Sequence, residues 1–368
     1  MARAGLGPSW ECLFANDFDP KKAATYINNW GPNEMYCGDV ASIKPTDLRG
    51  TPDLVWASFP CQDLSLAGDG KGLEGERSGS FWPFWELIQT ISREGRKPKA
   101  IVLENVVGTI TSRGGKDFTA LCSALREMDF QFGALVVDAA LYLPQSRPRL
   151  FIIAVDKSVP QSAEIVSVEP NRDFHTKRLC DAALGLPNNL RDNWVWWQLK
   201  RPPKRNSHLS DFIETNPIDV NWNSKEQTQK LLSMMSDVNR RKLALASTSG
   251  KLEVGTVYRR TRKNADGEKL QRAEVRFDGV AGCLRTPAGG SSRQTIILVK
   301  GKEIKTRLLS GRETARLMGL PEDYQLPESY NETYHLTGDG LAVPVVSAIS
   351  EQILLPILRE HGLSTRAA

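Results

Sequence analysis

The first 155 residues alternate short, β-branched apolar runs with stretches in which apolar residues recur every three to four positions. The apolar runs predict strands at Glu11–Ala15, Leu54–Ser58, Ala100–Leu103, Gly133–Val137 and Leu150–Val155. The intervening periodicity predicts helices over Lys21–Asn29, Phe81–Ser92 and Phe118–Met128, the last with Asp117 as its N-cap. Strands that alternate with helices in this way indicate βαβ units and a mostly parallel sheet, hence an α/β fold.

After Val155 the pattern loosens into irregular stretches rich in Pro, Asn and basic residues, such as LKRPPKRNSH and RRTRKNADGEK. Helical periodicity returns at Ser310–Met318 and Val346–Leu358. We therefore predict three segments. Residues 1–155 form the first part of an α/β domain, residues 156–305 form a basic inserted domain, and residues 306–368 return to the first domain.

The beginning of the chain departs from the usual α/β pattern. A doubly wound sheet normally opens with a strand that leads into a glycine-rich turn at a helix N-terminus. Here Ala4-Gly5-Leu6-Gly7 is already that turn, so the first strand is expected to be missing.

Composition narrows the class of protein. The 368 residues are 40% hydrophobic and 25% charged, which excludes collagen-like, coiled-coil and wholly disordered chains. No apolar run approaches the roughly 20 residues that span a bilayer, and no signal peptide is recognisable. Six Cys without a CxxC pair, and four scattered His, predict neither a metal site nor a disulfide framework. We expect a reduced, cytosolic setting without a membrane partner.

Positive charge is concentrated in one segment. Residues 251–310 hold fourteen Lys and Arg against six Asp and Glu, a net +8, which leaves −3 for the rest of a chain whose net charge is +5. Within it, Leu284–Gln294 combines glycines and small hydroxyl residues with Arg285 and Arg293. Such a segment suits phosphates and base edges in a DNA groove, although a charge run is more often a solvated face.

Three short sequences carry candidate chemistry: Pro60-Cys61-Gln62 after the second predicted strand, Glu104-Asn105 at the end of the third, and Gln145-x-Arg147-x-Arg149 entering the fifth. Taken singly, Cys61 is more often a small buried hydrophobe, and Glu104 is as often a capping residue. Two arginines at i and i+2 of a strand point to the same face, which suits an anion or a polar ring.

In this order and spacing, the three sequences resemble the DNA (cytosine-5) methyltransferase family. Further matches are Asn16-Asp17-Phe18-Asp19, Gly38-Asp39-Val40, the stretch RETARLMGLP from Arg312, and GDGLAVP from Gly338. The resemblance implies the Rossmann-like fold of S-adenosylmethionine-dependent methyltransferases, with a smaller target-recognition domain at 156–305. It also implies an enzyme that methylates C5 of a flipped-out cytosine in a specific duplex DNA sequence.

The resemblance also implies residue roles. Cys61 attacks cytosine C6, Pro60 fixes the backbone before it, Glu104 bonds the ring N3, Arg147 holds O2, and Arg149 and Asn105 support the site. S-adenosylmethionine is expected to contact Gly5, Gly7, Asp17, Phe18, Asp39, Val40 and Pro60, with Asp17 on the ribose and Phe18 on the adenine. Lys71 and Arg77 of a mobile loop, with Gln145, Arg285 and Arg293, are expected to bind DNA.

The sequence departs from the family in two places. Its first motif is truncated, for which we favour a start site upstream, and Asp339 stands where many relatives carry Asn. The alternatives are an impaired or cofactor-free DNA-binding remnant and an RNA cytosine-5 methyltransferase. The expected partner is double-stranded DNA, with a restriction endonuclease of the same system as a further candidate. The protein is expected to be a monomer in the bacterial cytosol.

Overall fold

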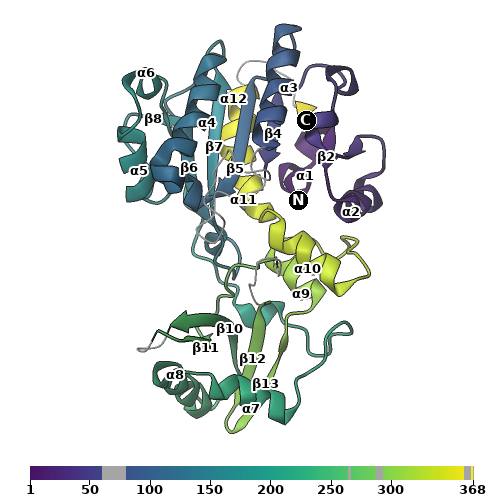
Figure 1. Ribbon diagram of the computed structural model, residues 1–368, viewed down its shortest axis with the longest axis vertical. Helices are drawn as coiled ribbons and strands as arrows, with labels where there is room; N and C mark the ends of the chain where they lie inside the picture. The colour runs from purple at the N-terminus through teal and green to yellow at the C-terminus, as the bar shows by residue number, and fades with distance from the viewer. Residues whose placement is uncertain (60–79, 264–266, 287–292, 360–365, 368) are drawn as a thin grey trace. The chain divides into compact units, whose positions relative to one another are not determined.

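A computed structural model describes the chain except residues 60–79, 264–266, 287–292, 360–365 and 368 (Figure 1). The chain divides into two compact units. The large unit comprises Ala2–Asp138, Pro148–Arg201 and Pro344–Ala368. The small unit comprises Met1, Ala139–Arg147 and Pro202–Val343.

The large unit is built on a sheet whose strands run parallel except for one. Its order is β1 (Glu11–Cys12), β14 (Arg366–Ala367), β4 (Leu54–Ser58), β5 (Ala100–Val106), β7 (Pro148–Asp156) and β6 (Phe130–Asp138). Strand β7 runs antiparallel to both of its neighbours. A separate parallel pair joins β2 (Ala15–Asp17) to β3 (Met35–Cys37). Every predicted strand is therefore present, the first of them divided between β1 and β2.

The start of the chain differs from the prediction. Residues expected to form a glycine-rich turn form the short helix α1 (Ala2–Leu6), and a 3-10 turn follows at Gly7–Ser9. Only Gly7 of this stretch has a left-handed backbone, with φ of 72°. Strand β14 lies between β1 and β4 and pairs in parallel with both.

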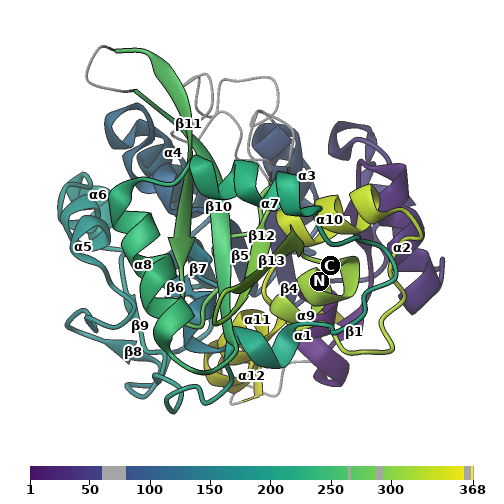
Figure 2. The same cartoon turned by 90° about the horizontal axis from the view of Figure 1, so that it is seen from below.

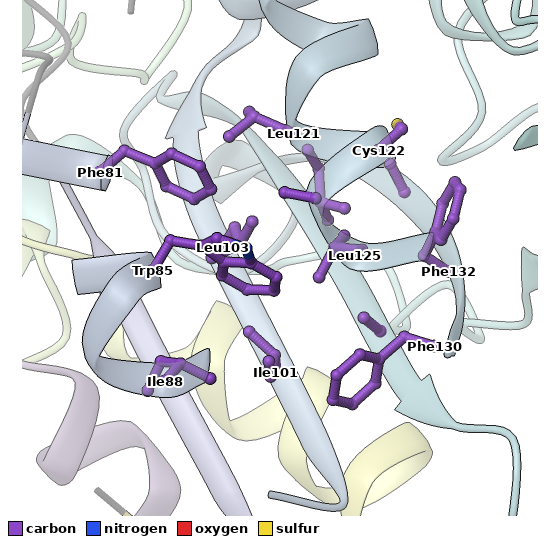
Figure 3. Close-up of a cluster of buried hydrophobic side chains, with 14 of the residues drawn as sticks. Phe81, Trp85, Ile88, Ile101, Leu103, Leu121, Cys122, Leu125, Phe130 and Phe132 are labelled. Atoms are coloured by element: carbon purple, nitrogen blue, oxygen red, sulfur yellow. The ribbon is translucent and has the colours of Figure 1, made fainter. Parts of the chain in front are cut away.

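Helices α3 and α4 bury their apolar faces on one side of this sheet. Phe81 and Trp85 stack 5.8 Å apart within α3 and lie against Ile101 and Leu103 of β5 (Figure 3). The large-unit helices are α1, α2 (Pro20–Trp30), α3 (Phe81–Arg93), α4 (Lys116–Glu127), α5 (Lys177–Leu184), α6 (Asn188–Arg191), α11 (Val343–Ile349) and α12 (Leu355–Arg359), the last two joined by a π-helical turn at Ser350–Leu354.

The beginning of α4 corrects a detail of the prediction. Its N-cap is Gly115, with φ of 90°, and Asp117 is the second residue of the helix. The buried Asp117 carboxylate accepts a hydrogen bond from Ser112 Oγ at 2.5 Å and pairs with Arg113 Nη2 at 3.0 Å. The acid still lies at the positive end of the helix dipole, but its side chain holds the preceding turn instead of capping the helix.

Residues 156–201 group with the large unit, whereas the sequence predicted that the inserted domain begins at 156. This segment, which contains β8 (Val166–Ser167) and β9 (Trp196–Trp197), covers the outer edge of β6. Phe132 N donates to Asn193 O at 2.9 Å, and Val195 N donates to Phe132 O at 2.9 Å. A Cβ on Gly133 would lie 2.0 Å from Val195 O, so glycine permits this close approach.

The small unit contains an antiparallel sheet in the order β11 (Lys269–Arg276), β10 (Glu253–Lys263), β12 (Thr295–Lys300), β13 (Glu303–Leu308). Helices α7 (Lys225–Ser233) and α8 (Asp237–Thr248) lie along this sheet (Figure 2). A second core gathers Ile296 of β12 with Leu317 of α9 (Gly311–Leu317) and Tyr334 of α10 (Tyr330–Asp339). Residues 306–343 therefore group with the small unit, whereas the sequence predicted that residues 306–368 return to the first domain.

Tyr330–Arg359 is the one stretch, among the residues that the structure describes, that is long and apolar enough to cross a membrane. No such stretch was expected from the sequence. Two thirds of its most apolar window (67%) is buried inside the protein. Burial of this kind is typical of a core helix, so length and composition are weak evidence for a membrane span here.

Candidate active site

Strands β4 and β5 bring two of the predicted motifs together at their carboxyl ends. Ser58 pairs with Glu104 in the parallel ladder. The Asn105 amide nitrogen donates to Phe59 O at 3.3 Å, while its oxygen accepts from Val106 N at 2.8 Å. Glu104 and Asn105 are both buried. The Glu104-Asn105 sequence thus lies beside the chain that leads into Pro60, at the sheet edge where α/β proteins bind ligands.

Several predicted residues lie outside the described part of the chain. These are Pro60, Cys61, Lys71 and Arg77. Their predicted roles in catalysis, cofactor binding and DNA binding stay predictions.

Arg149 lies beside Glu104. Its Nε is 3.3 Å from Glu104 Oε1, with 17% and 10% of the two side chains exposed. Arg149 is the second residue of β7 and pairs with Val106 at the end of β5. Because both groups are largely removed from water, their attraction is screened less than that of a surface pair. The pair places an acid and a forked donor at one strand end.

Arg147 has different surroundings from those expected. It precedes β7 and belongs to the small unit, where it is buried. Its Nη1 donates to Leu284 O at 3.0 Å, and its Nη2 donates to Gly338 O at 2.8 Å and Gly340 O at 2.6 Å. Arg147 and Arg149 do not point to the same face, because strand alternation begins only at Pro148. The contacts therefore favour Arg149 as the arginine next to Glu104, with Arg147 engaged elsewhere.

Gln145, which the sequence analysis expected to contact DNA, lies inside the small unit. Its side chain is fully buried. The amide nitrogen donates to Leu317 O at 2.5 Å, and the amide oxygen accepts from Leu284 N at 3.4 Å. A side chain whose donor and acceptor both serve buried backbone groups is part of the framework, since removing it would leave those groups unsatisfied.

The predicted cofactor residues gather at the ends of β2 and β3. Asp17 pairs with Cys37 across the two strands, and its Oδ1 accepts from Asp19 N at 2.9 Å. Burial raises the pKa of the Asp17 carboxyl above its ordinary value, despite that hydrogen bond. Phe18 next to it is 75% exposed. An exposed aromatic ring beside a partly desolvated acid offers a stacking face and a hydrogen-bond acceptor to a planar ligand.

Asp39 and Asn16 shape the neighbouring loop. Asp39 is the N-cap of the 3-10 turn Val40–Ser42, and its Oδ1 accepts from Ala41 N at 2.9 Å. Asn16 Nδ2 donates to Tyr36 O at 3.0 Å and Gly38 O at 2.8 Å, which joins the loop to β2. No role was predicted for Asn16 from the sequence. Its position directly before Asp17 was the signal available.

The two glycines predicted at the cofactor lie at the start of the chain. Gly5 is buried in α1, and its carbonyl accepts from Ser347 Oγ at 2.8 Å. Gly7 begins the 3-10 turn after α1. Both belong to the large unit, as do Asp17, Phe18 and Asp39.

Arg285 and Arg293 differ in how free their side chains are. Arg285 is exposed. Arg293 is half-buried, and its Nη2 donates to Asn331 Oδ1. Its guanidinium also lies 5.4 Å from the ring centre of Tyr330, within the range of a cation–π contact. Arg285 can therefore reach a ligand directly, whereas Arg293 is held by α10.

Comparison with known proteins agrees with these features. The C-5 cytosine-specific DNA methylase family matches residues 1–355. Among curated relatives, the Type II methyltransferase M.MspI of Moraxella sp is 25% identical over 350 residues, covering 94% of this chain and 66% of that protein. The Type II methyltransferase M.HhaI of Haemophilus parahaemolyticus is 25% identical over 346 residues, covering 93% and 87%.

Solved structures show the same fold. The Dnmt2 methyltransferase of S. pombe has a TM-score of 0.55 at 15% identity, covering 94% of this chain and 91% of that one. A putative DNA modification methyltransferase encoded within an E. coli prophage has a TM-score of 0.53 at 16% identity, covering 97% and 95%. The predicted methyltransferase fold is confirmed. With the family matched over nearly the whole chain, the protein belongs to the C-5 cytosine-specific DNA methylases.

Proposed function

We propose that this chain methylates C5 of cytosine within a specific duplex DNA sequence through a transient bond between Cys61 and C6 of the base. C5 methyltransferases use S-adenosylmethionine as the methyl donor. The observation that supports this mechanism best is the hydrogen bond between Asn105 and Phe59. It ties the chain two residues before Cys61 to the strand end that carries Glu104.

The chemistry requires a nucleophile because cytosine C5 is too electron-poor to take a methyl group unaided. Addition of the Cys61 thiolate forms the S–C6 bond and moves the C5–C6 π pair onto C5. When bound, S-adenosylmethionine supplies the electrophilic methyl group. Loss of the C5 proton to a base then returns the electron pair to the ring, and the C6–S bond breaks with release of the Cys61 thiolate.

Glu104 and Arg149 are proposed to hold the base during this addition. Glu104, which pairs with Arg149 in the structure, is proposed to take up a proton when the base binds and to donate a hydrogen bond to N3, where negative charge develops when the thiolate adds. Arg149, whose Nε already lies 3.3 Å from Glu104, offers further donors to the neighbouring O2. This assignment exchanges the roles that the sequence analysis expected for Arg147 and Arg149.

The residues of the β2–β3 edge fit an adenine nucleoside. The exposed Phe18 ring offers its face to the adenine. The Asp17 carboxylate lies one residue away and accepts from the ribose hydroxyls. Asp39 follows the neighbouring strand and accepts from the exocyclic amine, while its Oδ1 also caps the turn after it.

DNA contacts are assigned to the small unit. Its exposed basic residues include Arg259, Arg260 and Arg285. A cytosine stacked in the duplex cannot reach a pocket at a strand end, so it must flip out. The predicted contacts of Lys71 and Arg77, the monomeric state, the cytosolic location and a companion endonuclease stay predictions.

The proposal is tested with labelled S-adenosylmethionine and two substrates, a mixture of duplex DNA sequences and a mixture of tRNAs, followed by nucleoside analysis. Label in 5-methylcytosine from DNA, lost in Cys61→Ser, is the expected result. Label in tRNA alone contradicts the DNA assignment, and DNA binding without transfer to either substrate contradicts the enzymatic one.

A further inference from the structure

Within the small unit, the segment Ala281–Thr286 is held in place along most of its length. Ala281 N donates to Pro144 O at 2.7 Å, and Ala281 O accepts from Ser146 N at 2.8 Å. Cys283 O accepts from Tyr258 Oη at 3.1 Å. These contacts fix the path of the segment from two sides, by the chain before β7 and by β10.

The same segment approaches its neighbours more closely than a side chain would allow. A Cβ on Gly282 would lie 1.8 Å from Tyr258 Oη, and one on Gly338 would lie 3.0 Å from Thr286 N. Thr286 Oγ1 also donates to Asp339 Oδ1. Glycines at both contacts therefore permit a packing that leaves little freedom to the backbone of residues 281–286.

Arg147 joins this segment to the helix end at Gly338–Gly340. One guanidinium bonds Leu284 O on one side and Gly338 O and Gly340 O on the other. Gln145, two residues earlier, accepts from Leu284 N and donates to Leu317 O. The backbone carbonyl of Leu284 therefore bonds the Arg147 side chain, and its backbone N–H bonds the Gln145 side chain. Both of these side chains are buried.

Arg285 is the exception in this segment. It follows Leu284 directly, and its side chain is exposed. The backbone of Leu284 is held by two buried side chains, and the hydroxyl of Thr286 is hydrogen-bonded to Asp339. Arg285 lies between these two residues, so its exposed side chain projects from a fixed backbone. Fixed backbones are what base recognition needs, because a displacement of about 1 Å breaks the geometry of a bidentate contact.

We infer that Arg147 and Gln145 are positioning residues of DNA recognition, which fix Leu284 so that Arg285 meets one defined position of the target sequence. This inference rests on the proposed function. It assigns Arg147 to discrimination between sequences and leaves the holding of the cytosine to Arg149.

The identity of the clamping side chain matters. The planar fork of arginine can bond two carbonyl groups on one side and a third on the other, whereas a lysine ammonium is a single point donor on a flexible stem. Arg147→Lys keeps the buried charge but cannot satisfy the same three carbonyls together. It is therefore the variant that loosens the segment while disturbing the fold least.

The experiment measures methylation rates of wild type, Arg147→Lys, Arg285→Ala and the double variant on a randomised library of duplexes. We expect Arg285→Ala to lower discrimination about tenfold or more at the positions it reads. Arg147→Lys is expected to lower discrimination at those same positions, and the double variant to be no worse there than Arg285→Ala. Arg149→Lys, by contrast, is expected to slow all sequences alike.

If Arg147→Lys slows every sequence by the same factor and retains wild-type discrimination, the inference is wrong. Should that variant fail to fold, Thr286→Val loosens the segment from its other end without touching a buried charge, and the same loss of discrimination is expected.

Amide hydrogen exchange gives a readout independent of methylation, with faster exchange at residues 281–286 in either variant. A wild-type protein that methylates no DNA would contradict the proposed function, whereas unchanged exchange in both variants would contradict the clamp.

Discussion

Arg149 Nε lies 3.3 Å from Glu104 Oε1, where β7 and β5 meet at the end of the main sheet. This relationship places the two groups that we propose to hold the base on neighbouring strands of one sheet. It also separates two arginines that are only two residues apart in the chain, because Arg147 bonds backbone carbonyls of the small unit instead.

Removing the acid should disable catalysis. Glu104→Gln keeps the size of the side chain but loses the transferable proton, so we expect kcat to fall about 100-fold or more. Arg149→Ala is expected to act in the same direction. Methylation kinetics check both variants, and Arg201→Ala, which breaks the exposed pair with Asp173, is the matched control. An Arg149→Ala enzyme with normal kcat would show that the arginine plays no part in holding the base.

The exposed Phe18 ring should matter for the cofactor and not for stability. Because 75% of it is exposed, Phe18→Ala removes little buried area, but it removes the stacking face. We expect the KM for S-adenosylmethionine to rise about tenfold and the melting temperature to stay the same. Ile218→Ala, at a fully exposed apolar residue of the small unit, serves as the control and should change neither quantity. An unchanged KM in Phe18→Ala would exclude the stacking role.

The ionisation of Asp17 should make cofactor binding depend on pH. Its carboxyl has a raised pKa in the folded protein because it is partly buried. As the pH falls through that raised pKa, the carboxylate that accepts from the ribose is protonated and affinity drops, beginning above the ordinary Asp value of about 4. Titration calorimetry across pH 4–7 should show this step in wild type and not in Asp17→Asn.

The same group has a consequence for stability in the absence of cofactor. A carboxyl with a raised folded pKa binds its proton more tightly in the folded than in the unfolded state. Stability should therefore fall as the pH rises from the unfolded pKa through the folded one. Denaturant unfolding should show that contribution in wild type and lose it in Asp17→Asn; an identical pH profile in the two proteins would contradict the shift.

The buried pair of Arg307 and Glu313 should dominate the stability of the small unit. Both side chains are fully buried, and two hydrogen bonds of 2.7 Å join them. Arg307→Met leaves the buried Glu313 carboxylate without its positively charged partner, which should lower the free energy of unfolding by about 3–5 kcal/mol. Adding Glu313→Leu removes the unpaired charge and should recover part of that loss. Lys177→Ala, at the exposed pair with Asp181, should leave unfolding by denaturant unchanged. Equal stability of the single and double variants would contradict the argument.

The sequence predicted the sheet well because its strands are continuous apolar runs, as in Leu54–Ser58 and Ala100–Val106, the second of which is buried on both faces along almost its whole length. It predicted Glu104 and Asn105 as a pair because both come directly after the apolar run Ala100–Leu103, and in the structure they lie near the end of β5. The boundary at 156 could not be predicted, since composition does not reveal that residues 156–201 cover the edge of β6. The surroundings of Arg147 were equally out of reach, because its partners Leu284 and Gly338 lie far along the chain and no periodicity links them.

The central claim is that Cys61 forms a covalent bond to the target cytosine. The most direct measurement first identifies a duplex that the protein methylates. The same duplex is then synthesised with 5-fluorocytosine in place of the cytosine that is methylated. Because fluorine at C5 cannot leave as a proton does, the protein–DNA adduct persists. With S-adenosylmethionine present, we predict a stable protein–DNA species whose peptide mass assigns the bond to Cys61, absent in Cys61→Ser. Methyl transfer to DNA by Cys61→Ser at a rate near that of wild type would contradict the account.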